Sequence, residues 1–406
     1  MKGPYKVVLS ALVLVFLAFG TARTPSVGAE EPIADAKPSA ESRFPEGILF
    51  RLEAPGPLEA KEVVLRFRVG GEKASRYAPV PPPLTPGTGL KVEVLVRTDT
   101  ADRYIAPGAP IEYFFEVVDT QGRRLVSPPQ RFTLLDPRRG PWQEVRRGHL
   151  NAFFYGPLRQ RAEAVLSSAE GTIRLVAPLV GVEVMRPLTF TLFSNWKEMS
   201  AALPPTSQVL RTLLITEGTA FPETGVILIL ADDPRVEGVT AHETAHFLVH
   251  EAMGGICRLV PSWLNEGLAE YANPEAEGAY EAYLARALAQ KALLPVTLMA
   301  SPPGRADDVI LYYGQSKSLV RFLVDTFGKE KFTLLFRTLA EGQTIDNALR
   351  AVYGFDRREL ENRWRQAIGA PPLEEVAAPP ALPTPVPLPT IVPFGDLSFQ
   401  VIQRGS

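Results

Sequence analysis

The sequence predicts a multidomain protein in which an N-terminal all-β sandwich, of immunoglobulin-like or fibronectin-like type, precedes an α+β domain. Apolar and polar residues alternate at every second position within residues 45–136, whereas from Trp142 onward helix-like and strand-like segments mix and the pattern becomes helical after Glu266. With 46% hydrophobic residues in 406, the chain has material for two sizeable cores. We expect the segments in this order: a signal peptide at 1–29, a linker at 30–44, the sandwich at 45–136, the α+β domain at 141–370 and a Pro-rich tail at 371–406.

The N-terminus has the pattern of an export signal. A basic stretch ending at Lys6 precedes the apolar run Val7–Phe19, which is short for a bilayer span. Val27-Gly28-Ala29 offers the small residues that a signal peptidase reads, so Glu30 would begin the mature chain. The pattern predicts a secreted or cell-envelope protein, with an uncleaved N-terminal anchor as the alternative.

The sandwich prediction is based on strands of period two. Apolar positions alternate with charged ones at residues 65–69 and 90–97, and the pattern continues at 113–117. Gly, Pro and Asp turns separate these runs, as in sandwich domains of about this length. The segment contains no aromatic cluster and no acidic calcium motif, which favours a spacer or a packing partner of the second domain.

The second domain begins with mixed periodicity and becomes helical. We expect a helix at Leu158–Ser168 and strands at Thr172–Val176, Leu188–Phe193 and Gly225–Leu230. Later helices are expected at 280–291, 316–327, 329–340 and 356–368.

Two of the four histidines frame His242-Glu243-Thr244-Ala245-His246. On a helix, residues four apart share a face, so both imidazoles can reach one tetrahedral Zn²⁺ while Glu243 lies beside the open coordination position. The uncharged residues around the motif are those of a helix buried behind a metal. Two surface histidines on an ordinary helix would be the alternative.

A second helix supplies carboxylates. Twenty residues after His246 the chain reads Trp263-Leu264-Asn265-Glu266-Gly267-Leu268-Ala269-Glu270-Tyr271, between a helix start at Pro261-Ser262 and a stop at Asn273-Pro274. Glu266 would complete the metal ligands. Glu270, one turn later, could accept a hydrogen bond from the non-ligating nitrogen of a histidine and fix its tautomer, or it could be a solvated helix charge.

Together the two motifs resemble the gluzincin branch of zinc metallopeptidases, in particular the bacterial peptidase MA-like domains. The resemblance covers about residues 142–369 and implies an α+β, zincin-like metallopeptidase domain. It implies one Zn²⁺ per chain held by His242, His246 and Glu266, with Glu243 as general base. The metzincin pattern fails, because it needs Gly and His where this chain has Val249 and Ala252.

The oxyanion donor is expected in Leu311-Tyr312-Tyr313-Gly314-Gln315-Ser316, which opens an apolar helix. MA-like domains carry a similar Tyr-x-Gln-Ser stretch, and gluzincins place a transition-state tyrosine downstream of the glutamate ligand. By this resemblance Tyr313 is the chosen donor and Tyr312 stays open. Alternatively, both rings pack the helix start without a catalytic role.

These parts imply hydrolysis of peptide bonds, with Glu243 taking the proton of the attacking water. We expect the strand Gly225–Leu230 to be the edge strand that binds a peptide through its main chain. Residues Gly218 to Glu223 do not match the Gly-x-Met-Glu-Asn stretch by which related aminopeptidases recognise a free N-terminus, which favours an endopeptidase.

Other residues have plainer interpretations. His250 is interpreted as a helix-surface or polar-core histidine, and Cys257 as a small apolar core residue that can form no internal disulfide. A formal net charge of −2 without long basic runs argues against a nucleic-acid partner. The Pro-rich tail favours extended geometry and could associate with the cell envelope. We expect a monomer that acts on peptides or proteins.

Two alternative functions remain open at this point: a catalytically inactive or latent zinc-binding scaffold of the envelope, and a zinc hydrolase that acts on a bond other than a peptide. Two imidazoles and a carboxylate suit Zn²⁺, but other divalent ions fit similar geometry.

Overall fold

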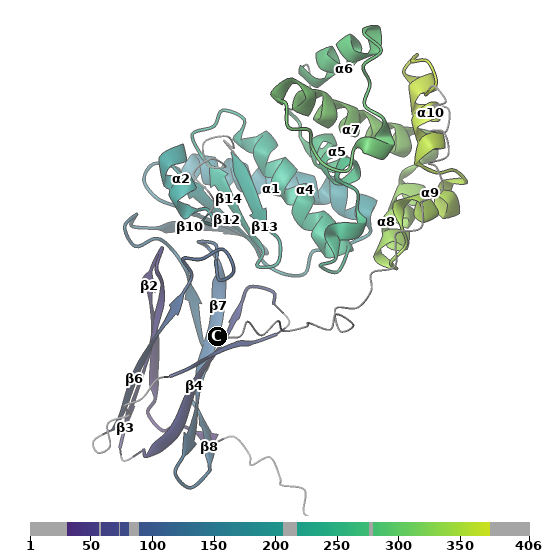
Figure 1. Ribbon diagram of the computed structural model, residues 1–406. Helices are drawn as coiled ribbons and strands as arrows, with labels where there is room; N and C mark the ends of the chain where they lie inside the picture. The colour runs from purple at the N-terminus through teal and green to yellow at the C-terminus, as the bar shows by residue number, and fades with distance from the viewer. Residues whose placement is uncertain are drawn as a thin grey trace, which may run out of the picture.

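The computed structural model describes residues 31–56, 58–72, 74–80, 89–205, 217–275 and 279–373. It shows an elongated β-sandwich below an α+β domain, most of whose helices lie on the side away from the sandwich (Figure 1). The predicted signal peptide lies outside the described residues, and so does the predicted tail from residue 374 onward.

The N-terminal part consists of two facing sheets around one core (Figure 1). The larger sheet has the order β1 (Glu31–Pro32), β8 (Arg124–Val126), β7 (Pro110–Asp119), β4 (Ala60–Val69) and β5 (Arg76–Pro79), with β9 (Gln130–Thr133) also paired to β7. The smaller sheet contains β2 (Lys37–Arg43), β3 (Gly47–Pro55) and β6 (Gly89–Arg97). The alternation in the sequence follows from this arrangement, because β4, β6 and β7 bury every second side chain over most of their length.

The predicted linker at 30–44 is wrong. β1 pairs with β8, and β2 pairs along its whole length with β3. The polar composition of Lys37–Arg43 hid this strand, because none of its side chains is fully buried. An immunoglobulin-like or fibronectin-like topology stays a prediction.

The second part contains a five-stranded sheet in the order β10 (Gln143–Arg147), β11 (Leu150–Phe154), β12 (Leu188–Phe193), β14 (Val226–Leu230) and β13 (Gly218–Phe221). The three inner strands are parallel, and the two outer strands are antiparallel to their neighbours. The helices are α1 (Arg159–Val180), α2 (Trp196–Ala202), α4 (Val236–Ala252), α5 (Ser262–Ala272), α6 (Ala279–Ala289), α7 (Ala306–Phe327), α8 (Lys329–Ala340), α9 (Ile345–Tyr353) and α10 (Arg357–Ala367).

The predicted strand at Thr172–Val176 is wrong, because these residues continue α1, which runs on from the predicted helix at Leu158–Ser168. Thr172 and Val176 are β-branched and favour strands locally. They nevertheless fall on the same buried stripe as Val165 and Ala169, at spacings of three and four residues. This stripe packs against α4, and tertiary packing therefore outweighs the local preference.

The predicted edge strand is also wrong. β14, which contains Val226–Leu230, lies inside the sheet between β12 and β13. All five of its residues are buried because both faces are covered, which explains its unbroken apolar run. Among the described strands, β13 ends the sheet on this side.

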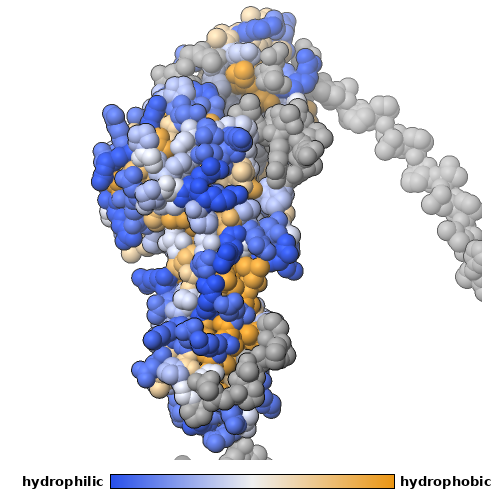
Figure 2. Space-filling view, turned by 90° about the vertical axis from the view of Figure 1, so that its left-hand side faces the viewer, coloured by the Kyte–Doolittle hydropathy of each residue, from blue (hydrophilic) through white to orange (hydrophobic). Residues whose placement is uncertain are grey.

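The sandwich covers one face of this sheet. The core of the sandwich includes Phe193 of β12 and Val226, Leu228 and Leu230 of β14, whereas Ile227 and Ile229 face the core of the α+β domain. Figure 2 shows both parts from the side, with polar side chains over much of the surface and an apolar area on the sandwich. The sequence favoured either a spacer or a packing partner as the role of the sandwich, and in the structure the sandwich packs against the second domain.

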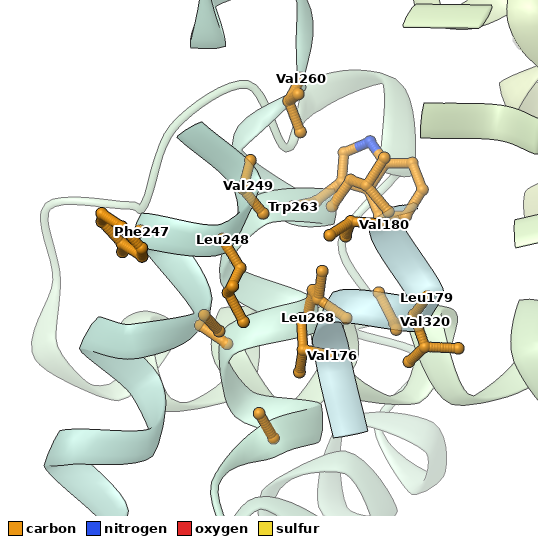
Figure 3. Packing of buried hydrophobic residues seen from close by; sticks show 14 of the residues in the cluster. Val176, Leu179, Val180, Phe247, Leu248, Val249, Val260, Trp263, Leu268 and Val320 are labelled. Carbon is orange, nitrogen blue, oxygen red and sulfur yellow. The ribbon is translucent and has the colours of Figure 1, made fainter. Parts of the chain in front are cut away.

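The core of the α+β domain lies behind α4 and α5. Leu248 of α4, Trp263 and Leu268 of α5, Val176 of α1 and Val320 of α7 pack together there (Figure 3). This packing fixes the two helices that carry the predicted metal ligands. Among the described residues, no helix combines the length and apolarity that a membrane span requires.

Candidate metal centre

The His-Glu-x-x-His motif lies on α4, as predicted. The Nε2 atoms of His242 and His246 are 3.0 Å apart, and each lies 3.5 Å from Oε2 of Glu266 on α5. The three side chains remain 16–18% exposed, whereas Thr240, Ala241 and the residues of the helix that face the core are buried. The structure therefore brings the three predicted ligands together at a site that solvent can reach.

Two outer contacts orient the imidazoles. Nδ1 of His242 lies 2.9 Å from Oε1 of Glu270, which is the contact predicted for this carboxylate. Nδ1 of His246 lies 3.1 Å from Oδ1 of Asn265. Because both partners are oxygen acceptors, each Nδ1 carries a proton and donates, which leaves both Nε2 lone pairs directed at the same point.

This donor set fits a divalent cation. Two lone pairs and a carboxylate oxygen converge, with all three ligand atoms within 4.8 Å of one another. Such convergence is unfavourable unless a proton or a metal ion lies between the groups. Imidazole nitrogens and a carboxylate are ligands that Zn²⁺ accepts in catalytic sites with an open fourth position. His242, His246 and Glu266 would hold the ion.

The electrostatics point the same way. Burial opposes charge on His246, but the hydrogen bond and the negative charge of Glu266 outweigh it and raise the pKa of His246 to about 9. Burial alone would raise the pKa of Glu266, but the hydrogen bond and charge of His246, together with His242, lower it. A proton or a cation between these groups is therefore stabilised.

Tyr313 and Tyr312 have different surroundings. The ring centroids of Tyr313 and His242 are 6.3 Å apart, and the pKa of Tyr313 is raised by burial and by the negative charges of Glu266, Glu270 and Glu243. Tyr312 is buried and donates its hydroxyl to the backbone oxygen of Met299 over 3.4 Å. Tyr313, the predicted donor, therefore faces the site, and Tyr312 anchors a loop.

A glycine on α5 allows α7, which carries Tyr313, to lie close to the metal ligands. A Cβ at Gly267 of α5 would lie 2.4 Å from the backbone oxygen of Ser316 of α7, which is too close for any other residue. The two helices therefore cross in contact, and Tyr313, one turn before Ser316, reaches the ligand Glu266.

The edge strand β13 passes over the predicted base. A Cβ at Gly218 would meet Cγ of Glu243 at 2.7 Å and its Oε1 at 3.2 Å. Only glycine therefore lets the strand lie this close to the carboxylate, which places main-chain groups beside the site.

Sequence reasoning missed three residues that contact His246 or Glu270. Asn265 directly precedes a ligand on the same helix, so its proximity was open to prediction. Asn273 donates to Oε2 of Glu270 over 3.1 Å from beyond the end of α5. Tyr280 of α6 brings its hydroxyl within hydrogen-bonding reach of Glu270. No local signal marks Tyr280, because it reaches the site only through the packing of α6 against Gly314 of α7.

A partly parallel sheet, a helix with two oriented histidines and a second helix with a glutamate define a metal-dependent hydrolase centre. A family model described as the Peptidase MA superfamily matches residues 167–370, just over half of the chain. The chain belongs to this superfamily, and the family resemblance stated from the sequence is confirmed. No protein among those with curated function matches the sequence.

Several solved structures are similar. The M1 zinc metallopeptidase from Deinococcus radiodurans is 14% identical, with 79% of this chain and 89% of that chain covered and a TM-score of 0.34. A mutant M1 zinc metallopeptidase from the same organism, bound to a Tyr-Ser-Ala substrate, is 15% identical, with coverages of 78% and 89% and a TM-score of 0.34. The Br derivative of BhCBM56 is 12% identical over 24% of this chain and 91% of that chain, with a TM-score of 0.19.

Proposed function

We propose that the protein is a zinc-dependent endopeptidase with one catalytic Zn²⁺ per chain. The observation that carries this proposal is the convergence of the two Nε2 atoms and the Glu266 carboxylate, with both Nδ1 atoms held by acceptors. Membership of the Peptidase MA superfamily supports peptide bonds as the substrate class.

When bound by His242, His246 and Glu266, the ion would supply Lewis acidity for activating water and the scissile carbonyl. Glu243 follows the first ligand on α4 and acts as general base, taking the proton of the attacking water and passing it to the leaving amine. Tyr313 donates a hydrogen bond to the oxyanion as it forms. Asn265 and Glu270 hold the two imidazoles in the tautomer that presents Nε2.

The substrate would bind along β13. Among the described strands this one pairs with β14 alone, so its other side can accept an extended peptide through main-chain hydrogen bonds. The contact between Gly218 and Glu243 would place the scissile bond beside the base. Main-chain recognition of this kind tolerates many side chains, which predicts broad specificity.

Endopeptidase action is supported by the surroundings of this strand. Glu217, the acid at its start, is paired with Arg235 and is therefore engaged rather than open to a substrate amine. Residues 218–223 also lack the aminopeptidase stretch named above. For localisation we propose export to the cell envelope or beyond, on the basis of the basic and apolar pattern of residues 1–29.

The test uses an internally quenched peptide blocked at both ends and the same peptide with a free N-terminus. An endopeptidase cleaves both at internal bonds, and mass spectrometry locates the cut. Release of single residues from the free N-terminus, without cleavage of the blocked peptide, would show an exopeptidase instead. Glu243→Gln serves as the inactive control.

A further inference from the structure

One arginine from the loop between α1 and β12 holds the turn that joins β13 to β14. Nη2 of Arg186 donates to the backbone oxygen of Pro222, and Nη1 of Arg186 donates to the backbone oxygen of Glu223 over 3.2 Å. A guanidinium presents several donors in one plane, so a single side chain can bind two successive carbonyls. The end of β13 is therefore attached to a residue outside its own hairpin.

The same guanidinium is anchored on α4. Nε and Nη2 of Arg186 donate to Oε1 of Glu251 over 2.9 Å and 2.6 Å, and both side chains of this pair are only 21% exposed. Charge-assisted hydrogen bonds of this kind are stronger than neutral ones. The guanidinium carbon also lies 4.7 Å from the centroid of the Phe247 ring. Because Phe247 directly follows the ligand His246, Arg186 joins the turn after β13 to the helix of the metal centre.

The sandwich covers this contact with two glycines that follow β4. A Cβ at Gly71 would lie 2.9 Å from Nη1 of Arg186, and a Cβ at Gly70 would lie 2.7 Å from Cα of Thr224. The sandwich therefore lies directly on the guanidinium and on the turn after β13, at a separation that leaves no room for a side chain.

These contacts fix β13 relative to α4 at both ends. Gly218, at the start of β13, lies against Glu243 of α4. The turn that Arg186 holds follows the last residue of β13, about 10 Å further along the strand. A strand attached to α4 at both ends keeps a constant distance from the metal ligands and from the base.

We propose that Arg186 is a positioning residue of the peptidase, which holds β13 in the conformation that binds substrate. This inference rests on the proposed function, because it assumes that a peptide pairs with β13. Without Arg186 the turn is released, and a peptide must order the strand as it binds, which lowers its apparent affinity. The metal ligands, Glu243 and Tyr313 lie on α4, α5 and α7 and keep their places. Loss of Arg186 therefore raises KM and leaves kcat nearly unchanged.

The kinetic test uses the blocked, internally quenched peptide described above. Arg186→Gln should raise KM at least about tenfold and change kcat by less than about twofold. Arg186→Lys keeps the charge but cannot bind both carbonyls and Glu251 together, so its KM should lie between those of wild type and Arg186→Gln. Arg174→Gln, the same exchange at an exposed position of α1, is the matched control and should behave like wild type. Zinc bound at the central site of His242, His246 and Glu266 should be equal in all four proteins.

Hydrogen–deuterium exchange tests the contact without substrate. Amides of residues 218–225 should exchange faster in Arg186→Gln than in wild type, whereas those of α5 should not change. Glu251→Gln should have a similar effect, and adding it to Arg186→Gln should add little, because both substitutions break the same contact. Glu251→Gln also provides the test if Arg186→Gln does not fold.

Peptide binding separates this inference from the proposed chemistry. The same peptide, labelled with fluorescein, is titrated into Glu243→Gln with and without Arg186→Gln, and Kd should rise at least about tenfold in the double variant. Equal Kd values, unchanged exchange in residues 218–225, or a loss of kcat without a rise in KM would overturn the inference. If the wild type bound the peptide without cleaving it, the proposed endopeptidase activity would fail, and the change in Kd would still decide the role of Arg186.

Discussion

Nδ1 of His242 lies 2.9 Å from Oε1 of Glu270, so a side chain of α5 fixes the orientation of a ring on α4. Oε2 of the same carboxylate accepts from Asn273. A metal ligand held in this way loses little freedom when it binds the ion.

Glu270→Ala should therefore weaken zinc binding by roughly 10- to 100-fold, the usual effect of losing an outer partner of a metal-bound histidine. Competition with a chromophoric chelator measures the affinity. Glu281→Ala, at an exposed position of α6, is the control and should leave it unchanged. Equal affinities in Glu270→Ala and wild type would mean that Glu270 does not position His242.

Tyr313→Phe should lower kcat by about 10²- to 10³-fold with little change in KM, because an oxyanion donor acts mainly in the transition state. Tyr312→Phe should retain most of the activity, since that hydroxyl donates to the backbone oxygen of Met299. Steady-state kinetics of both variants decide between the two tyrosines. A large loss of kcat in Tyr312→Phe alone would reverse the assignment.

The metal-free protein should lose stability as the pH rises from about 6.5 to about 9. Burial disfavours charge on His246, yet Glu266 raises its folded-state pKa to about 9, above its ordinary value of 6.5. A group whose pKa is raised on folding stabilises the folded protein fully when the pH is below its unfolded-state pKa. This contribution is lost as the pH rises past its folded-state pKa. Thermal melts of chelated protein across this range should show the decline, and His246→Ala should flatten it. An equal decline in both proteins would assign it to other groups.

The α+β domain should not remain soluble without the sandwich. Phe193, Val226, Leu228 and Leu230 pack into the sandwich core and would become exposed. Burying each such side chain contributes about 1.5–3 kcal/mol, so their sum rivals the 5–15 kcal/mol stability of a typical protein.

A fragment of residues 141–370 is therefore expected to aggregate or to melt without cooperativity, as calorimetry and size-exclusion chromatography would show. A chain of residues 30–373, which lacks the predicted signal peptide and the predicted tail from residue 374 onward, should behave like the full protein. If the 141–370 fragment unfolded cooperatively at the wild-type Tm, the five-stranded sheet would not need the sandwich for its stability.

Much of the fold and site follows from local patterns in the sequence. The spacing of His242 and His246 places both on one face of a helix, and Glu266 and Glu270 follow by the same rule on α5. Alternation predicted β4, β6 and β7. These features need only the period of a helix or a strand.

The errors arose where distant packing decides. The unbroken apolar run of β14 signalled a strand covered on both faces, but the covering sandwich lies far away in sequence. β2 looked like a linker because a half-buried strand can be polar. Thr172 and Val176 favour strands locally, yet α4 holds them in a helix. Tyr280 reaches Glu270 only through the packing of α6 on α7.

The most direct test of the central claim compares wild type, Glu243→Gln and His246→Ala for bound zinc and for cleavage of casein. The account predicts that wild type binds zinc and cuts internal bonds, and that chelation abolishes cleavage. Glu243→Gln should keep zinc at the central site but lose turnover by at least about 10²-fold, whereas His246→Ala should lose both. Near-normal cleavage by Glu243→Gln, or a wild-type chain that binds no zinc, would contradict the account.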